Sequence, residues 1–444
     1  MNQRQLDEYL AFLRFPSIST DPAHKADVNA CAEWLAAKLR SMGLMTTLHP
    51  TAGHPIVVAK NAHVAGRRTV MIYGHYDVQP VDPVALWDSP PFEPRVADGY
   101  VFARGSADNK GQHFAHVLGI EETLREKREL PVNLILLIEG EEEIGSEHLD
   151  GFLATHHDEL RCDLIAISDT GMIAKGVPTF TYGLRGVAAM EVRVKGPASD
   201  LHSGLYGGAI MNPLTALARL LATLHDPDGR VAVPGFYDAI PPLEKWEREA
   251  WAKLPYHDAD ILALTGAPEL FGEAGYTAVE RTCARPTAEL NGIGGGFQGV
   301  GTKTVLPSEA FAKLTFRLVP NQRAADVLAK VAAHLRQRCP CGVTIEVAPG
   351  HSGEPYVTDP NSADGLAARR ALQRAFPGKE VALVREGGSI PILNTFKRIL
   401  GVDTLLLGLA LPDCRAHAPN ENFPLENFFG GIRLNRALIE ELAK

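Results

Sequence analysis

Short apolar runs that end in a histidine or in carboxylates recur along the chain. Residues 132–138 read Val-Asn-Leu-Ile-Leu-Leu-Ile, typical of a strand buried on both faces, and the cluster Glu139-Gly140-Glu141-Glu142-Glu143 follows directly. Residues 69–73 lead in the same way to His75, and residues 163–168 lead to Asp169. Closely spaced carboxylates raise one another's pKa, so the cluster needs a neighbouring positive charge. An isolated glutamate triplet is more often solvated surface, but the repeated placement of such groups at strand ends favours a bound cation.

The predicted strands alternate with segments of helical periodicity. Helices are predicted over residues 6–13 and 27–42 and from the turn at 104–111 to about 127, and strands over 56–59, 69–73, 132–138 and 163–168. Such alternation predicts an α/β domain with a mostly parallel sheet and helices on both faces. Ligands bind beyond the carboxyl ends of the strands in sheets of this kind. His75, Asp108, the glutamate cluster and Asp169 are all predicted there or in the adjoining loops.

The middle of the chain has a different pattern. Residues 188–195 and 311–319 alternate between apolar and polar side chains, as in a sheet with one solvated face. Further strands are predicted at 287–293 and 343–347, and helices at 213–224 and 324–338. The order β-α-β-β-α-β predicts a ferredoxin-like α+β domain over residues 186–354. An insertion at about 227–285 interrupts this domain, and its role is left open.

After the middle segment the α/β pattern resumes. A helix is predicted at 362–376, a buried strand at 403–409 and a helix at the C-terminal end. Residues 1–185 and 355–444 are therefore predicted to form one discontinuous domain. A Gly-rich hinge at 183–186 permits closure of one domain on the other.

Composition narrows the choice of partners. The chain has 444 residues, and this length favours two domains. Its formal net charge of −9 argues against nucleic acid or an anionic membrane as partner. Its six cysteines form no Cys-x-x-Cys pair, so we expect a reduced setting rather than a cysteine-type zinc site. The polar first residues and the lack of a run of about 18 apolar residues predict a cytoplasmic protein without a membrane span.

Six residues form a candidate set of imidazoles and carboxylates: His75, Asp108, Glu142, Glu143, Asp169 and His417. Such ligands suit zinc, with manganese and cobalt as alternatives. Five ligands with one shared aspartate are enough for two metal ions about 3.5–4 Å apart. Taken singly, each residue is weak evidence for a metal site, because His75 could be a structural histidine and Asp108 could be a helix cap. Their joint placement favours a metal site. No Gly-x-Ser-x-Gly elbow or activated cysteine offers a nucleophile instead.

Six segments together resemble a known family. They are residues 74–80 (GHYDVQP), 87–94 (WDSPPFEP), 104–111 (RGSADNKG), 139–146 (EGEEEIGS), 200–204 (DLHSG) and 385–391 (REGGSIP). The chain resembles, over essentially its whole length, the di-zinc aminoacyl-hydrolase family of cytosolic non-specific dipeptidases, carnosine dipeptidases, acetylornithine deacetylase, succinyl-diaminopimelate desuccinylase and glutamate carboxypeptidases. The first two segments are most similar to the dipeptidase branch. The resemblance implies that the ferredoxin-like domain serves as a lid and dimerisation domain.

The resemblance implies the roles of the metal ligands. Asp108 would bridge two divalent metal ions, which are zinc in the family. His75 and Asp169 would complete one site, and Glu143 and His417 would complete the other.

The same resemblance separates the glutamates. Glu142 would be the general base that deprotonates a metal-bound water and later protonates the leaving amine. By eye Glu141, Glu142 and Glu143 can be permuted, but alignment on the following Gly-Ser makes Glu143 the ligand. Glu141 is then left without a role and is expected at the surface. Asp77 would hold the His75 ring by a hydrogen bond.

The second domain would contribute substrate contacts. The resemblance implies that His202 stabilises the oxyanion from the partner subunit of a homodimer. Arg317 would bind the terminal carboxylate of the substrate, and Gly387, Gly388 and Ser389 could surround it with backbone N–H groups. Without the family, His202 would be taken for a surface loop histidine and Arg317 for part of a solvated strand face.

The predicted function is hydrolysis of the amide bond of dipeptides or small peptides by a metal-bound hydroxide. The enzymatic alternative is deacylation of N-acyl amino acids of the acetylornithine or succinyl-diaminopimelate type. A non-catalytic metal-binding protein is disfavoured, because no ligand and no base is missing. Residues 356–361 lack a further histidine that carnosine dipeptidases carry there, which argues against carnosine-type specificity.

Overall fold

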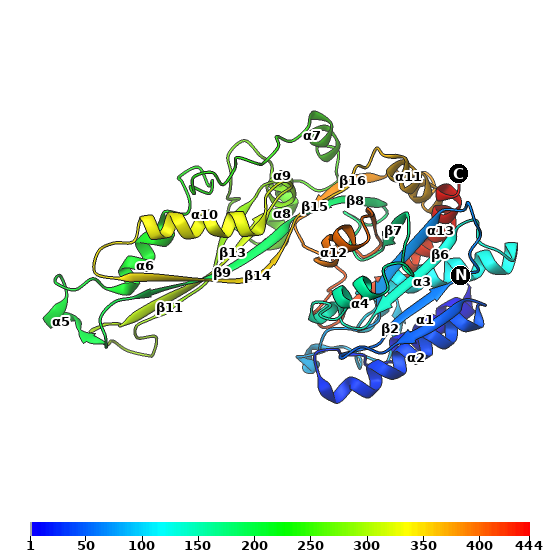
Figure 1. Ribbon diagram of the computed structural model, residues 1–444, viewed down its shortest axis with the longest axis horizontal. Coiled ribbons are helices and arrows are strands. Elements are labelled where there is room, and N and C mark those ends of the chain that lie inside the picture. The colour runs from blue at the N-terminus through cyan, green and yellow to red at the C-terminus, as the bar shows by residue number, and fades with distance from the viewer. Residues whose placement is uncertain (1) are drawn as a thin grey trace. The chain divides into compact units, whose positions relative to one another are not determined.

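Four of the predicted buried strands form the parallel centre of one sheet (Figure 1). The computed structural model describes residues 2–444. The central strands are β3 (Thr69–His75), β6 (Asn133–Glu139), β7 (Leu164–Ile167) and β17 (Thr404–Gly408). β3 pairs in parallel with β6 and with β7, and β17 pairs in parallel with β7. Every residue of β6, β7 and β17 is buried, which explains why these strands read as continuous apolar runs.

The order of the strands places their carboxyl ends together. The sheet runs β1-β2-β6-β3-β7-β17-β8, with β1 (Met45–His49), β2 (Ile56–Lys60) and β8 (Thr179–Leu184) antiparallel to their neighbours. The chain passes from β3 to β6 on one side and then to β7 on the other side of β3. This reversal of direction creates a crevice at the carboxyl ends of β3, β6 and β7, where such sheets bind ligands.

Helices pack against this sheet and against one another. α2 packs on β1 and β2, α3 packs on β3, and α13 packs on α3 and on α11. The helices of this unit are α1 (Gln3–Leu13), α2 (Lys25–Ser41), α3 (Lys110–Lys127), α4 (Leu149–Thr155), α11 (Ala363–Ala375) and α13 (Leu425–Leu442). Three short strands, β4 (Arg95–Ala97), β5 (Tyr100–Phe102) and β18 (Asn422–Pro424), form a separate sheet. The predicted α/β class with a mostly parallel sheet is confirmed.

A second sheet is antiparallel and has the order β11-β13-β9-β14. Its strands are β9 (Gly186–Lys195), β11 (Thr287–Gly295), β13 (Glu309–Leu318) and β14 (Thr344–Gly353). Alternate residues of β9 are buried, and they pack with α6 (Pro213–Ala222) and α10 (Ala324–Gln337) on one face of the sheet (Figure 1). This is the predicted ferredoxin-like arrangement.

The insertion in the second unit carries three short helices, α7 (Lys245–Trp251), α8 (Asp258–Thr265) and α9 (Ala278–Ala284). Outside the insertion, β10 (Leu201–His202) pairs with β12 (Val305–Leu306) and precedes the single turn α5 (Ser203–Tyr206). β15 (Tyr356–Val357) pairs with β8. The role of the insertion stays open.

The chain divides into one unit of residues up to Tyr182, Thr358–Val384 and Thr395–Lys444, and a second of Gly183–Val357 and Arg385–Asn394. β8, β16 (Ala382–Glu386) and α12 (Ile392–Ile399) have residues in both units. The predicted division differs for residues 385–394, which it gave to the first domain. In the second unit Arg385 pairs with Glu247, and Ser389 accepts a hydrogen bond from Arg317. The other predicted boundaries stay predictions.

Among residues 2–444, no helix combines the length and apolarity needed to cross a membrane.

Candidate metal centre

His75 ends β3 and points a free ring nitrogen at two carboxylates. The side chain is 0% exposed, and its Nε2 atom has no hydrogen-bond partner of suitable geometry. That atom lies 3.3 Å from Asp108 Oδ1 and 3.8 Å from Asp169 Oδ1. A buried, unpartnered imidazole nitrogen facing carboxylate oxygens is satisfied by a metal ion, so the residues present fit a metal site.

The other ring nitrogen of His75 is oriented by Asp77. His75 Nδ1 lies 3.2 Å from the backbone oxygen of Asp77 and 3.3 Å from its Oδ1 atom. Asp77 Oδ2 also accepts the backbone N–H of Glu143 at 3.1 Å. Asp77 thus contacts His75 at the end of β3 and Glu143 just after β6. A hydrogen bond to the second ring nitrogen of a ligating histidine fixes its tautomer.

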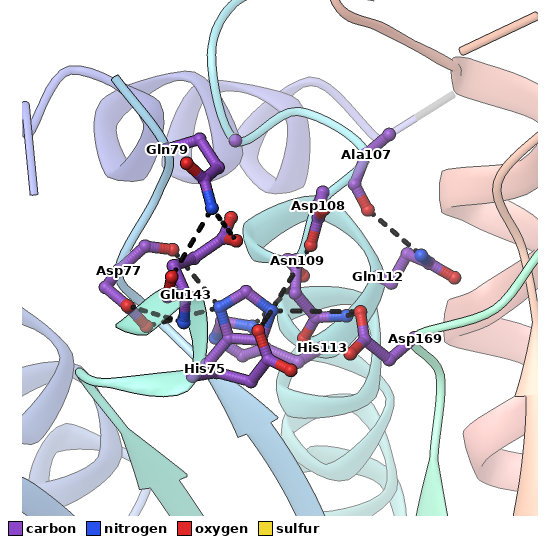
Figure 2. A network of polar contacts seen from close by, with 12 residues as sticks. His75, Asp77, Gln79, Ala107, Asp108, Asn109, Gln112, His113, Glu143 and Asp169 are labelled. Carbon is purple, nitrogen blue, oxygen red and sulfur yellow. Dashed lines mark hydrogen bonds and ion pairs between the residues drawn. The ribbon is translucent and has the colours of Figure 1, made fainter. Parts of the chain in front are cut away.

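Two groups of potential ligands share Asp108, and Figure 2 shows four of their five members: His75, Asp108, Glu143 and Asp169. One is His75, Asp108 and Asp169; the other is Asp108, Glu143 and His417. Within each group the ligand atoms all lie within 4.8 Å of one another. His417 Nε2 lies 2.8 Å from Asp108 Oδ2 and 3.3 Å from Glu143 Oε2. The structure therefore brings all five predicted ligands together, and we call the two groups the His75 triad and the His417 triad.

Two amide side chains that the sequence analysis did not single out orient ligands. Asn109 Nδ2 donates to Asp169 Oδ1 at 2.7 Å, and Gln79 Nε2 donates to Glu143 Oε2 at 2.8 Å (Figure 2). Asn109 directly follows Asp108, to which it is joined by a cis peptide. Both amides lie inside segments that carry the family resemblance, which was the only signal available for them.

One residue of the glutamate cluster, Glu141, differs from the prediction. Glu141 is 2% exposed, accepts the backbone N–H of His54 at 2.9 Å and lies 2.7 Å from His148 Nδ1. The prediction that Glu141 is surface is wrong, because the loop at Gly53 covers it: a Cβ there would lie 1.6 Å from Glu141 Oε1. Glu142 begins the short 3-10 helix η3 (Glu142–Ile144), with its Oε2 atom 4.0 Å from His75 Nε2.

The electrostatics of the site show an excess of carboxylates. Burial raises the pKa of Glu142 well above its usual range and that of Asp169 to about 6. Burial acts in the same direction on Asp108, but its hydrogen bond with His417 and the His75 imidazole 3.3 Å away hold its pKa below the usual range. Hydrogen bonds with Asp108 and Glu143 raise the pKa of His417 to about 10. The two triads hold three carboxylates, those of Asp108, Glu143 and Asp169, against two imidazoles, so divalent cations would supply the missing positive charge.

The remaining predicted residues lie in the second unit. His202 is exposed at the end of β10, and its Nδ1 atom accepts the backbone N–H of Gly204 at 3.0 Å. Arg317 Nη1 donates to Ser389 Oγ at 2.9 Å, so these two predicted substrate contacts are neighbours. Gly387 is tightly enclosed, since a Cβ there would lie 2.8 Å from Arg185 Nη2, whereas Gly388 has open space.

A metal-ligand cluster at the carboxyl edge of a parallel sheet defines the protein as a metallohydrolase candidate, and family comparison agrees. Residues 71–441 match the model of Peptidase family M20/M25/M40, so the chain belongs to this family. The resemblance found in the sequence is confirmed.

Similar proteins of the family include two dipeptidases and a metallo-carboxypeptidase. The Cys-Gly metallodipeptidase dug1 of Schizosaccharomyces pombe is 31% identical over 460 residues, which cover 99% of this chain and 96% of that protein. The Beta-Ala-His dipeptidase of Homo sapiens is 30% identical over 397 residues, covering 88% of this chain and 78% of that protein. The crystal structure of the M20 family metallo-carboxypeptidase Sso-CP2 from Sulfolobus solfataricus has a TM-score of 0.85 at 32% identity and full coverage of both chains.

Proposed function

We propose that the protein is a metal-dependent dipeptidase that hydrolyses the amide bond of dipeptides. The observation that carries this proposal is the pair of triads that share Asp108, with Glu142 beside them. The names of the Schizosaccharomyces pombe and human relatives, both dipeptidases, support the choice of substrate.

Five residues would hold two divalent metal ions: His75, Asp108, Glu143, Asp169 and His417. Zinc suits this mixture of imidazole and carboxylate, with manganese and cobalt as alternatives. When bound, such ions polarise the amide carbonyl and lower the pKa of water by acting as Lewis acids.

Glu142 would move the protons of the reaction. Burial raises the pKa of its carboxyl, which makes the carboxylate a stronger base than an exposed glutamate. It would take a proton from the attacking water and give it to the amine that leaves when the C–N bond breaks. Its position outside both triads leaves its oxygens available for this task.

Residues of the second unit would bind the substrate. Arg317 would pair with the terminal carboxylate, with Ser389 and the backbone N–H groups of Gly387 and Gly388 beside it. The hydrogen bond between Arg317 and Ser389 supports a shared role. His202 would donate a hydrogen bond to the developing oxyanion.

We infer that His202 acts in the partner subunit of a homodimer. β11 is an edge strand of the antiparallel sheet and exposes Leu290 and Ile293, at 44% and 55%. An unpaired edge with apolar side chains favours association with a second chain.

A cytoplasmic location is proposed because all six cysteines are free.

A substrate screen with zinc, manganese and cobalt in turn tests the proposal. The panel pairs each dipeptide with the N-acetyl or N-succinyl derivative of its C-terminal amino acid, so that only the acyl group differs. We expect chelator-sensitive hydrolysis of the dipeptides. Preference for the acylated amino acids would make the protein a deacylase, and the absence of any metal-dependent hydrolysis would refute both.

A further inference from the structure

Glu421 is a buried carboxylate whose hydrogen bonds end on the turn that presents Asp108. Its Oε1 atom accepts the backbone N–H groups of Ala107, at 2.7 Å, and of Asp108, at 3.0 Å. Its Oε2 atom accepts the backbone N–H of Gly105 at 2.8 Å and Nη1 of Arg104 at 2.9 Å. These bonds occupy the roughly four acceptor positions of a carboxylate, so Glu421 has no lone pair left for a cation. It is not itself a metal ligand.

Arg104 extends these contacts to the loop that follows β3. Its side chain is 1% exposed, and its Nη2 atom donates to the backbone oxygen of Pro80 at 2.8 Å. The neighbouring Gly105 has φ +81°, and a Cβ there would lie 2.7 Å from Val78 Cγ1. The turn before Asp108 therefore packs directly on residues 75–80, the segment that begins with the histidine ligand of β3.

Glu421 also belongs to the loop that presents the other histidine ligand. It lies four residues after His417 in the chain. Its backbone oxygen accepts the N–H of Ala103 at 3.1 Å, and β18 pairs with β5 immediately beyond. The chain that leads into the Asp108 turn is thus held in register with the chain that carries His417.

We propose that Glu421 is a positioning residue that couples the two metal sites. It fixes the backbone from which Asp108 projects and ties it to the loop of His417. Since Asp108 belongs to both triads, a displaced turn weakens both sites together. The ion pair of Glu421 with Arg104 is neutral as a whole, so it orients the shared ligand without adding net charge. This inference rests on the metal sites of the proposed function, but not on the substrate.

The variant Glu421→Gln tests the coupling, because it keeps the shape of the side chain and puts an NH₂ group among N–H donors. Titration of the metal-free protein with cobalt(II) is expected to show affinity about 10- to 100-fold lower at both sites, as for other groups that orient metal ligands. The cobalt absorption spectrum, which reports ligand geometry, is expected to change as well.

Glu121→Gln is the matched control. Glu121 is also a buried carboxylate of the first unit, and it lies 2.7 Å from Arg4 Nη2 and 2.9 Å from Lys38 Nζ. It contacts no residue of the triads. Its variant is expected to lower the melting temperature but to leave the cobalt affinity and spectrum unchanged.

Glu421→Asp separates positioning from folding, because it keeps the charge opposite Arg104 and withdraws the oxygens by one methylene. We expect native circular dichroism, weaker cobalt binding at both sites and activity that recovers partly at raised metal concentration. Unchanged affinity in both variants, weakening at one site alone, or failure of both to fold with metal present would overturn the proposal. If the wild-type protein binds cobalt but hydrolyses no dipeptide, the proposed function fails while this measurement stands.

Discussion

His417 Nε2 lies 2.8 Å from Asp108 Oδ2, although 309 positions separate the two residues in the chain. The second unit is inserted between them in the sequence. They meet because β17 pairs in parallel with β7, so the segment after β17 returns to the carboxyl edge of the sheet. The His417 triad therefore arises from the topology of the sheet and from no local motif.

Glu142→Ala is expected to keep the metal content of the wild type while lowering kcat by about 10²- to 10⁴-fold, because Glu142 belongs to neither triad. Elemental analysis gives the metal content, and dipeptide turnover gives kcat. Glu147→Ala is the control, since Glu147 is exposed on the following turn. Near-normal turnover in Glu142→Ala would rule out Glu142 as the base.

Asp108→Ala is expected to lose both metal ions, because its carboxylate is the only ligand common to the two triads. His417→Ala should lose one ion and keep the other. The stoichiometry is measured after equilibrium dialysis against a fixed metal concentration. Asp158→Ala, at a side chain 95% exposed, serves as control. Two bound ions in Asp108→Ala would exclude a bridging role.

His202→Ala is expected to lower kcat by about 10²- to 10³-fold with unchanged metal content, as for loss of an oxyanion donor. If His202 acts across a homodimer, mixing this variant with Glu142→Ala should restore activity, since each mixed dimer then contains one intact site. The mixture is assayed after dissociation and reassembly of the subunits. Activity no higher than the sum of the two variants would argue against a shared site.

His116 predicts a pH dependence of stability in the metal-free protein. Its Nε2 atom lies 2.7 Å from Ser168 Oγ, its Nδ1 atom accepts from Asn435 Nδ2 at 3.2 Å, and burial lowers its pKa to about 4. The neutral ring stabilises the fold above pH about 6.5, the unfolded value, and this contribution is lost as the pH falls toward 4.

Between pH 7.5 and 5 the loss amounts to about 2 kcal/mol of unfolding free energy. Urea unfolding of the metal-free protein at the two pH values measures it. His116→Gln should be less stable at pH 7.5 but show a smaller fall toward pH 5. A fall of the same size in both proteins would assign the dependence to other groups.

The centre of the fold was predictable because strands buried on both faces have continuous apolar sequences. β8 was not predicted, since Thr179, Thr181 and Gly183 interrupt its apolar pattern. The short helices of the insertion were also missed, because seven or eight residues contain too few turns for a clear periodicity.

The candidate site, like the fold, was predictable in part from the sequence. His75 and Asp169 stood out because they end apolar runs, whereas His417 had no signal apart from the family resemblance. Asn109 and Gln79 were missed because their partners lie 60 and 64 positions away. The environment of Glu141 is set by residues 53–54 and by His148, and no periodic pattern records such a contact. The catalytic roles assigned to these residues stay predictions.

The place of Asp108 in both triads also implies an order of events during synthesis. Residues 75–169 emerge first and carry the complete His75 triad, but the His417 triad has to wait until the inserted unit and β17 have been made. If the triads hold metal ions as proposed, a nascent chain would bind at most one ion through a triad, with Asp108 already engaged. The second ion would then join a ligand that the first has prearranged, which predicts sequential loading.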